Sequence, residues 1–346
     1  MSDQPLLRVF LSHTEEALAA QYLESGLEEL RRIADVVVNP TGHVLSGAEL
    51  SAAAAGCEVI IAHRATPGLA ETFATAPDLV AFLRAAVDVS TIDVGAASAA
   101  GILVTRTGAV FENPVAELAF GMMIDLARGV SRMRGDYLAG RLPSAPRGVG
   151  LAAATLGIVG YGRIGRRLAA MARGWGMQVL VFDPATPPEP PLEAAGSLEV
   201  LLAASHFVVC LAASTPETAG MFDARAFAAM RPGACFLNLS RGELVNEDAL
   251  EGALDSGHLR GAGLDVGLAP DQMPSPRFTA RPDVVATPHI GGVTPEARMH
   301  QTMDTVRQVA ALSTGRIPEG ALNPDTASRL VRLAGRHGTS DGGDPT

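Results

Sequence analysis

The sequence predicts an α/β protein with two domains, each built on a doubly wound parallel sheet. Short apolar segments alternate with helix-like segments along almost the whole chain, which is the pattern of parallel strands joined by crossover helices. The alternation starts afresh near residue 155, where a glycine-rich turn follows an apolar strand. The length of 346 residues also exceeds what a single hydrophobic core usually serves, which favours two domains.

The first series of alternating segments covers residues 7–105. Helices are predicted at 15–31, at 47–55, just after Pro67 and at 92–100, and strands at 7–11, 35–38, 58–62, 79–83 and 102–105. Because units of this length join parallel neighbours, we expect one parallel sheet with helices on both faces.

The second series runs from 155 to about 290. Its strands are predicted near 156–160, 178–182, 206–211, 234–239, 262–265 and 284–286. A long apolar helix at 114–134, opened by Pro114, precedes this series. A further helix from Pro295 to Ser313 is long enough to return to the first domain, which residues 321–324 would close.

These segments predict a discontinuous first domain and a continuous second one. The first domain would comprise residues 1–112 and 298–326, and the second would comprise residues 113–297. Residues 327–346 are rich in glycine, serine and aspartate, so we expect a flexible tail there.

Composition excludes several classes of function. The net charge of −10 argues against a nucleic-acid partner. All 27 basic residues are arginine, which excludes a lysine Schiff base. Three cysteines without metal-ligand spacing indicate reduced thiols and a cytoplasmic protein. No apolar run approaches about 18 residues, so neither a membrane span nor secretion is expected.

The turn that opens the second series has the spacing of a phosphate-binding site. Gly160 permits the tight turn, Gly162 lets the backbone approach a pyrophosphate, and Gly165 lets the next helix pack close to the strand. The positive N-terminal end of that helix would face the phosphates. This arrangement is typical of a Rossmann-like dinucleotide-binding domain.

Asp183 ends the next strand, 18 positions after Gly165. An acidic residue about 20 positions on takes the ribose hydroxyls of NAD in this kind of domain. No basic residue follows Asp183 until Arg225, so nothing there would neutralise the 2′-phosphate of NADP. We therefore predict NAD as the cofactor.

Three motifs together give the chain a strong resemblance to the D-isomer-specific 2-hydroxyacid dehydrogenases, which include phosphoglycerate dehydrogenase and glyoxylate/hydroxypyruvate reductase. They are the glycine turn, the segment Asn-Leu-Ser-Arg-Gly-Glu-Leu-Val-Asn-Glu-Asp-Ala-Leu at 238–250, and Thr-Pro-His-Ile-Gly-Gly at 287–292. The resemblance covers roughly residues 1–326. It implies a flavodoxin-like substrate-binding domain, a Rossmann NAD-binding domain and a small-molecule substrate.

The resemblance also implies roles for individual residues. Arg241, which follows a predicted strand, would bind the carboxylate and carbonyl of a substrate through its planar guanidinium. His289 would be the acid/base at the 2-hydroxyl. Asp265 would hydrogen-bond the nicotinamide amide, and the backbone amides of Arg163 and Ile164 would meet the pyrophosphate.

Two departures from the family pattern stand out. The glutamate that orients the family's catalytic histidine is replaced by Pro270, five positions after Asp265. Asp271, one position later, is our candidate substitute. In the first domain, the family's glycine-flanked turn for the substrate carboxylate corresponds to Ala86, Val87 and Asp88. A carboxylate at Asp88 would repel an anionic substrate.

The family contacts its substrate just after a strand of the first domain, where this chain has His63 and Arg64. We expect an NAD-dependent oxidoreductase acting on a D-2-hydroxy or 2-keto acid or a related carbonyl compound. The alternatives are a catalytically impaired NAD-sensing protein and a dehydrogenase of a non-carboxylate or partly cationic substrate. The resemblance further suggests a homodimer through the helix at 114–134, whose apolar face contains Leu118, Met122 and Leu126.

Overall fold

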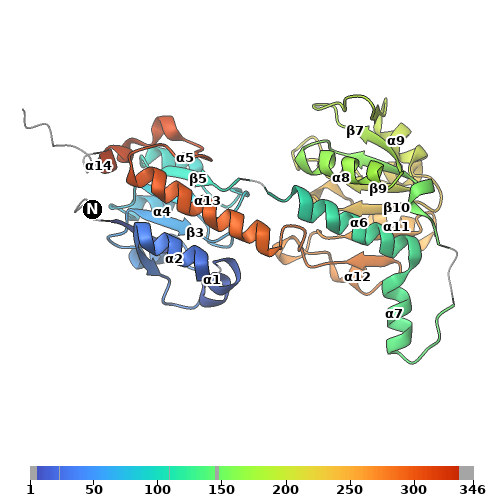
Figure 1. The fold of residues 1–346 in the computed structure, drawn as a ribbon, viewed down its shortest axis with the longest axis horizontal. Coiled ribbons are helices and arrows are strands. Elements are labelled where there is room, and N and C mark those ends of the chain that lie inside the picture. The colour runs from blue at the N-terminus through green and yellow to red at the C-terminus, as the bar shows by residue number, and fades with distance from the viewer. Residues whose placement is uncertain (1–5, 23, 109, 145–147, 335–346) are drawn as a thin grey trace, which may run out of the picture. The chain divides into compact units, whose positions relative to one another are not determined.

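The computed structural model describes residues 6–22, 24–108, 110–144 and 148–334. The chain divides into two compact units (Figure 1). Unit 1 is Met1–Ala109 together with Pro295–Thr346, and unit 2 is Val110–Thr294. The division thus falls three residues before each of the two predicted domain boundaries.

Unit 1 contains a five-stranded parallel sheet in the order β2-β1-β3-β4-β5. Its strands are β1 (Leu7–Leu11), β2 (Ala34–Val38), β3 (Val59–Ala62), β4 (Ala81–Arg84) and β5 (Leu103–Arg106). This is the flavodoxin-like strand order that the resemblance implied. In such a sheet all the carboxyl ends lie along one edge, which is where ligands bind.

Helices cover both faces of this sheet. One face carries α1 (Glu15–Gln21), α2 (Glu24–Ile33) and α13 (Pro295–Ser313), and the other carries α3 (Gly47–Ala53), α4 (Ala70–Thr75) and α5 (Val94–Ala99). Each face has its own apolar core. The bounds of α13 are those predicted from the sequence.

The prediction of a single helix over 15–31 is wrong. Helix α1 ends at Gln21, because its C-cap Tyr22 leaves the helical conformation with ψ at 88°, and α2 starts at Glu24. The buried hydroxyl of Tyr22 lies 2.6 Å from Oγ1 of Thr305 on α13, which holds Tyr22 at the end of α1. Leu23 lies outside the described residues.

Residues after α13 contact the strand β5 of unit 1. Ala321 bridges Thr105 of β5 in antiparallel fashion, and Oδ1 of Asn323 accepts a hydrogen bond of 2.7 Å from the backbone N–H of Val104. These contacts return the chain to the edge of the sheet.

The flexible tail predicted from residue 327 does not begin there. Residues 328–330 form a helical turn and α14 (Val331–Ala334) follows. Leu333 is 2% exposed in the core, and Arg329 donates hydrogen bonds of 2.7 and 2.8 Å to the carbonyls of Ala76 and Leu79. Residues 335–346 lie outside the described part of the chain.

Unit 2 contains a seven-stranded parallel sheet in the order β12-β11-β10-β9-β6-β7-β8. Its strands are β6 (Thr155–Val159), β7 (Gln178–Phe182), β8 (Glu193–Ala194), β9 (Phe207–Cys210), β10 (Cys235–Asn238), β11 (Gly261–Leu264) and β12 (Val284–Ala286). Apart from an added strand, this is the Rossmann order. The two-residue strand β8 was too short to be predicted.

Helices pack on both faces of this sheet as well. One core contains residues of α6 (Glu112–Arg128) and α8 (Arg163–Gly174), and the other contains residues of α9 (Leu198–Ala204), α10 (Ala224–Ala229) and α11 (Glu247–Asp255). The short helix α12 (Pro276–Thr279) lies beside β12. The prediction of two parallel-sheet α/β domains is therefore confirmed.

The single helix predicted over 114–134 is wrong in extent. Helix α6 ends at Arg128, because the left-handed backbone of its C-cap Gly129 (φ 68°) stops the helix, and α7 (Val130–Leu138) starts after it in a new direction. Helix α7 has no buried residue and extends away from the sheet of unit 2 (Figure 1).

The helix face proposed for a dimer also packs differently from the prediction. Met122 is 2% exposed, and Leu118 and Leu126 are partly buried against the core of the same unit. These three side chains therefore stabilise their own domain.

Among the described residues, no helix is long and apolar enough to cross a membrane.

Candidate active site

The glycine turn follows β6 and shows why each glycine is needed. Gly160 has φ at 99°, and a Cβ there would collide with the backbone of Leu211 and Ala212. A Cβ on Gly165 would collide with the carbonyl oxygen of Gly160. At Gly162, by contrast, a Cβ would meet no protein atom within 4 Å. The turn is therefore closed on its inner side and open beside Gly162.

Helix α8 begins in this open space. Gly162 is its N-cap, and no side chain caps the first turn. Backbone N–H groups at a helix N-terminus favour an anion, and the helix dipole adds to that preference. The side chain of Arg163 forms an ion pair with Glu112 at the start of α6. The open space and the uncapped turn fit the pyrophosphate of a dinucleotide.

Asp183 lies at the end of β7, next to the glycine turn. Its Oδ2 accepts a hydrogen bond of 2.6 Å from the backbone N–H of Tyr161, and its Oδ1 accepts bonds of 2.9 Å from Ala185 and Thr186. The carboxylate is thus held between the turn and its own loop. This places a negative charge beside the glycine turn, as the NAD prediction requires.

Arg241 follows β10. The buried side chain of Asn238 brackets this turn by donating to the carbonyl of Arg241 at 2.9 Å and accepting from the N–H of Ser240 at 3.1 Å. A Cβ on Gly242 would collide with the backbone of Gly267, so the loops after β10 and β11 are in direct contact. The half-buried Arg241 therefore extends from a rigid turn.

Asp265, which follows β11 and is 2% exposed, holds the loop that carries His289. Its Oδ1 accepts hydrogen bonds of 2.7 Å from the hydroxyl of Thr287 and 2.8 Å from the N–H of Ile290, and its Oδ2 accepts one of 2.9 Å from the N–H of Gly291. Its own backbone carbonyl accepts from the N–H of His289 at 3.0 Å. Because it accepts hydrogen bonds from Thr287, Ile290 and Gly291, the Asp265 carboxylate anchors the loop that carries His289.

Nδ1 of His289 lies 3.1 Å from the backbone carbonyl oxygen of Asp271. The sequence pointed to Asp271 as the substitute for the missing glutamate, through its carboxylate. In the structure the main chain of Asp271 contacts the imidazole. Pro270, at the glutamate's position, starts the short helical turn that contains Asp271.

The residues predicted for substrate binding in unit 1 lie at the carboxyl ends of two neighbouring strands. His63 and Arg64 follow β3, and Ala86, Val87 and Asp88 lie in the loop after β4. The exposed Asp88 turns back on its own loop, because its Oδ1 accepts a hydrogen bond of 2.9 Å from the N–H of Ser90.

Three residues that tie the loops after β1, β3 and β4 together were not predicted. Arg84, fully buried at the end of β4, donates to the carbonyl of His63 at 2.5 Å and to Oγ1 of Thr91 at 2.8 Å. Burial lowers the pKa of Arg84 to about 10, against the opposing charge of Asp88. Ser12 and Thr66 add a hydroxyl pair at 2.8 Å. The sequence offered one signal for the role of Arg84, because an arginine directly follows the predicted apolar strand at 79–83.

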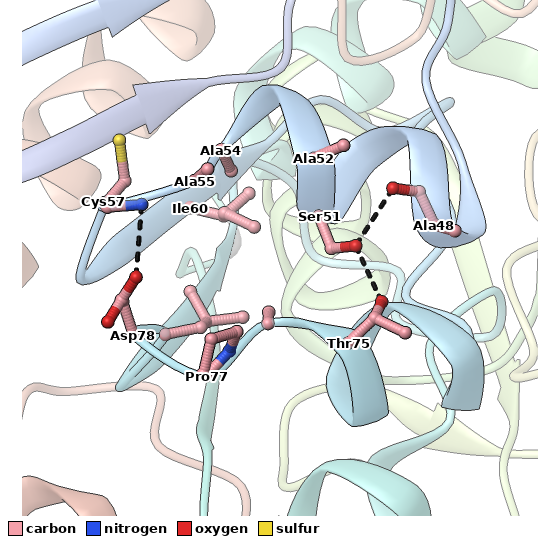
Figure 2. Close-up of a pocket in the computed structure, with 13 residues that line it drawn as sticks. Ala48, Ser51, Ala52, Ala54, Ala55, Cys57, Ile60, Thr75, Pro77 and Asp78 are labelled. Carbon is pink, nitrogen blue, oxygen red and sulfur yellow. Dashed lines mark hydrogen bonds between the residues drawn. The ribbon is translucent and has the colours of Figure 1, made fainter.

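A cavity of about 320 Å³ lies elsewhere in unit 1, at the amino ends of β3 and β4 (Figure 2). Alanines line much of it, and Ser51 and Thr75 face each other with their oxygens 2.6 Å apart. Because ligands of parallel sheets bind at the carboxyl ends, this cavity is separate from the predicted site.

The cysteines are free thiols, and all three are buried. Burial raises the pKa of Cys210 and of Cys235 to about 12, so these thiols stay protonated at neutral pH. Within the described ranges, no group of three or more His, Cys, Asp or Glu residues could hold a metal ion.

Comparison with known proteins agrees with this geometry. Residues 120–291 match the family model of the D-isomer-specific 2-hydroxyacid dehydrogenase, NAD-binding domain. A glyoxylate reductase of Thermococcus litoralis is 34% identical over 266 residues, which cover 74% of this chain and 80% of that protein. The chain belongs to the D-isomer-specific 2-hydroxyacid dehydrogenase family. NAD, predicted from the glycine turn and Asp183, is the cofactor that the matching domain binds.

Other members of the 2-hydroxyacid dehydrogenase family are longer. A D-3-phosphoglycerate dehydrogenase of Mycobacterium leprae is 34% identical over 281 residues, which cover 80% of this chain and 53% of that protein. The chain thus spans about half the length of the phosphoglycerate dehydrogenases of Mycobacterium that it matches.

Solved structures share the fold. A protein from Thermus thermophilus superimposes with a TM-score of 0.80 at 32% identity, covering 91% of this chain and all of that one. The D-lactate dehydrogenase of Escherichia coli has a TM-score of 0.77 at 22% identity, covering 92% of this chain and all of the other. The second likeness shows the fold alone.

Proposed function

We propose that this 2-hydroxyacid dehydrogenase homologue is an NAD-dependent oxidoreductase that interconverts a D-2-hydroxy acid, or a related alcohol, and its 2-keto form. One observation carries the proposal. The glycine turn, Arg241, Asp265 and His289 follow β6, β10, β11 and β12, which are all parallel strands of one sheet. They therefore lie along the edge where doubly wound sheets bind their ligands.

Each residue has a separate task in this proposal. NAD supplies the hydride acceptor, or NADH the donor, at carbon 2 of the substrate. The amides of Arg163 and Ile164 would hold the pyrophosphate and Asp183 the ribose hydroxyls. Arg241 would bind the carboxylate and polarise the carbonyl through its planar fork. A direct contact between Asp265 and the nicotinamide stays a prediction.

His289 would move the proton. In the reductive direction the imidazolium donates a proton to the carbonyl oxygen as hydride reaches carbon 2, and in the oxidative direction the neutral imidazole removes the hydroxyl proton. His289 is only half-buried, so water can return its proton between turnovers.

The loops after β3 and β4 would select the substrate, which makes unit 1 the substrate-binding domain. Ala86 and Asp88 stand at the glycine positions of the family's turn, with Val87 between them, so the loop carries a carboxylate. Asp88 hydrogen-bonds within its own loop, and in this proposal its carboxylate still repels a small anionic substrate bound beside that loop. We therefore expect weak turnover of glyoxylate, pyruvate and hydroxypyruvate, and better turnover of a larger or less anionic carbonyl compound.

A carbonyl screen with NADH tests the activity. The screen would offer 2-keto acids of increasing size together with neutral and cationic ketones, with NADH oxidation followed at each. Arg241→Ala should abolish turnover and leave NADH binding within about twofold, whereas Arg225→Ala, at an exposed position, should alter neither. NADH binding without turnover on any carbonyl would favour the NAD-sensing alternative, and turnover of cationic ketones alone would favour the non-standard dehydrogenase.

We also propose a cytoplasmic homodimer. The support for the compartment is the set of buried, unpaired thiols. The support for a dimer is α7 and the loop after it, where Val130, Tyr137, Leu138 and Leu142 expose between 50% and 92% of their surface. Sedimentation of the wild type and of a Tyr137→Asp, Leu138→Asp variant tests it, and a wild type that sediments as a monomer at micromolar concentration would refute the dimer.

A further inference from the structure

We infer that the main-chain carbonyl of Asp271, presented by a pair of left-handed residues, orients His289 in place of a carboxylate side chain. The inference rests on the proposed role of His289 as the acid/base. It assigns Asp271 as a positioning residue that acts through its backbone, and it makes the charge of its side chain dispensable for that task.

The backbone geometry on both sides of the contact is unusual. Among the described residues, only three other than glycine have positive φ: Asp271 at 58°, Gln272 at 57° and His289 at 55°. A positive φ costs a residue with a Cβ free energy and persists where the surroundings enforce it. Asp271 and His289 contact each other, with the Asp271 carbonyl oxygen 3.1 Å from Nδ1 of His289, and Gln272 is the next residue after Asp271.

The loop that carries Asp271 is tied at both ends. The N–H of Gly267 donates to the carbonyl of Gln272 at 2.9 Å, and the N–H of Ala269 donates to the carbonyl of Met273 at 3.0 Å. A Cβ on Gly267 would lie 2.7 Å from Cα of Pro274, so the two ends of the loop are packed against each other. The carbonyls of Gln272 and Met273 thus accept hydrogen bonds within the loop, whereas the left-handed turn directs the carbonyl of Asp271 to the imidazole.

The histidine is fixed from the other side by Asp265. The N–H of His289 donates to the carbonyls of Asp265 at 3.0 Å and Thr287 at 2.9 Å. The flanking N–H groups of Ile290 and Gly291 are held by the Asp265 carboxylate. The backbone of His289 and its Nδ1 are therefore both constrained, which leaves Nε2 as the ring atom that meets the substrate.

The chemistry of the acceptor determines the tautomer. A carbonyl oxygen can only accept a hydrogen bond, so Nδ1 must carry a proton and Nε2 is the nitrogen that gains and loses one. This is the proton arrangement that a carboxylate partner would also impose. A carbonyl oxygen is neutral, however, so it orients the ring without placing a negatively charged group beside Nδ1.

Substitutions of Asp271 that differ in their tolerance of positive φ distinguish a role of its main chain from a role of its side chain. Asn and Gly both accept the left-handed conformation, whereas β-branched Val does not. With the same substrate and NADH, we expect kcat of Asp271→Val to fall about tenfold or more below that of both Asp271→Gly and Asp271→Asn. KM for NADH should stay similar in all three, because the glycine turn is unaltered.

A nitrogen-15 NMR spectrum of the full chain tests the same point without turnover. In spectra of the neutral imidazole, His289 should show the Nδ1–H tautomer in the wild type and in the Asn and Gly variants, and a mixture of tautomers in the Val variant. His289→Gln identifies the resonances. Asp271→Gly and Asp271→Asn shifting to a mixture would show that the carboxylate orients the ring and would overturn the inference.

If Asp271→Val does not fold, Gln272→Val and Gln272→Gly provide the same contrast at the second left-handed residue. A Val variant that keeps both the Nδ1–H tautomer and the kcat of the Gly variant would also overturn the inference. If the carbonyl screen finds no substrate but the tautomer pattern holds, the proposed reaction is wrong while the assignment of Asp271 stands.

Discussion

The carboxylate of Asp183 accepts a hydrogen bond of 2.6 Å from the backbone N–H of Tyr161, which joins the end of β7 to the glycine turn after β6. The residue proposed to bind the ribose is thereby fixed relative to the turn proposed to bind the pyrophosphate. A charged acceptor makes this hydrogen bond stronger than a neutral one.

Replacing Asp183 with alanine should weaken NADH binding. A hydrogen bond to a charged group contributes about 1.5–3 kcal/mol, so we expect the Kd for NADH to rise about tenfold to a hundredfold. The preference for NADH over NADPH should shrink as well, because the charge that repels a 2′-phosphate is gone. Fluorescence titration measures both constants. Glu189→Ala removes a charge from an exposed position of the same loop and should leave them unaltered.

Alanine substitutions at two glycines of the turn should differ in their effects on NADH binding and on the free energy of unfolding. Gly165→Ala places a Cβ against the carbonyl of Gly160 and should lower the free energy of unfolding by about 1–3 kcal/mol. Gly162→Ala places its Cβ in the open space, so it should cost below about 1 kcal/mol of stability, from the weaker N-cap, yet weaken NADH binding strongly. Urea unfolding and NADH titration on both variants check this. Equal losses of stability would contradict it.

Asp265→Asn should loosen the His289 loop. Asparagine keeps one acceptor oxygen, but its NH2 group cannot accept, so the bonds from Thr287, Ile290 and Gly291 cannot all be kept. We expect a loss of about 1.5–3 kcal/mol in unfolding free energy and a clear fall in kcat. Asp248→Asn, at a carboxylate that is 87% exposed, is the matched control and should change neither. If the two variants behave alike, Asp265 does not anchor the loop.

His206 should make stability depend on pH. Burial and the nearby Arg231 lower its pKa, and its Nδ1 accepts a hydrogen bond of 3.0 Å from the N–H of Thr155. Because the unfolded chain binds the proton more readily, stability should be complete above about pH 6.5 and fall as the pH decreases below it. His206→Asn keeps an acceptor without titrating. Thermal unfolding from pH 7.5 to 5 should therefore be less pH-dependent in the variant than in the wild type.

Periodicity and glycine spacing predicted much of the fold because both are local properties. Alternating apolar strands and amphipathic helices indicated two parallel sheets, and the bounds of α13 follow from its own sequence. Breaks within long apolar helices were missed at Tyr22 and Gly129. The first helix ends where the side chain of Tyr22 is hydrogen-bonded to α13, and the second ends where Gly129 adopts a left-handed backbone conformation. Neither cause can be read from the hydrophobic pattern.

The buried polar contacts of unit 1 were missed for a related reason. Arg84 is fully buried, yet its guanidinium bonds to the carbonyl of His63, 21 positions away in the sequence. Sequence patterns rank arginine as an exposed residue. Only the parallel pairing of β3 with β4 brings these two loops together.

The sequence by itself determined the phosphate-binding turn and the cofactor, because both depend on residue type at fixed spacing along the chain, and the family resemblance of its motifs predicted roles for Arg241 and His289. It also showed that Pro270 stands where the orienting glutamate is expected. Only the tertiary structure decided what contacts His289 in its place. That partner is a main-chain carbonyl, and its direction is set by backbone torsions and by packing between loops that follow different strands.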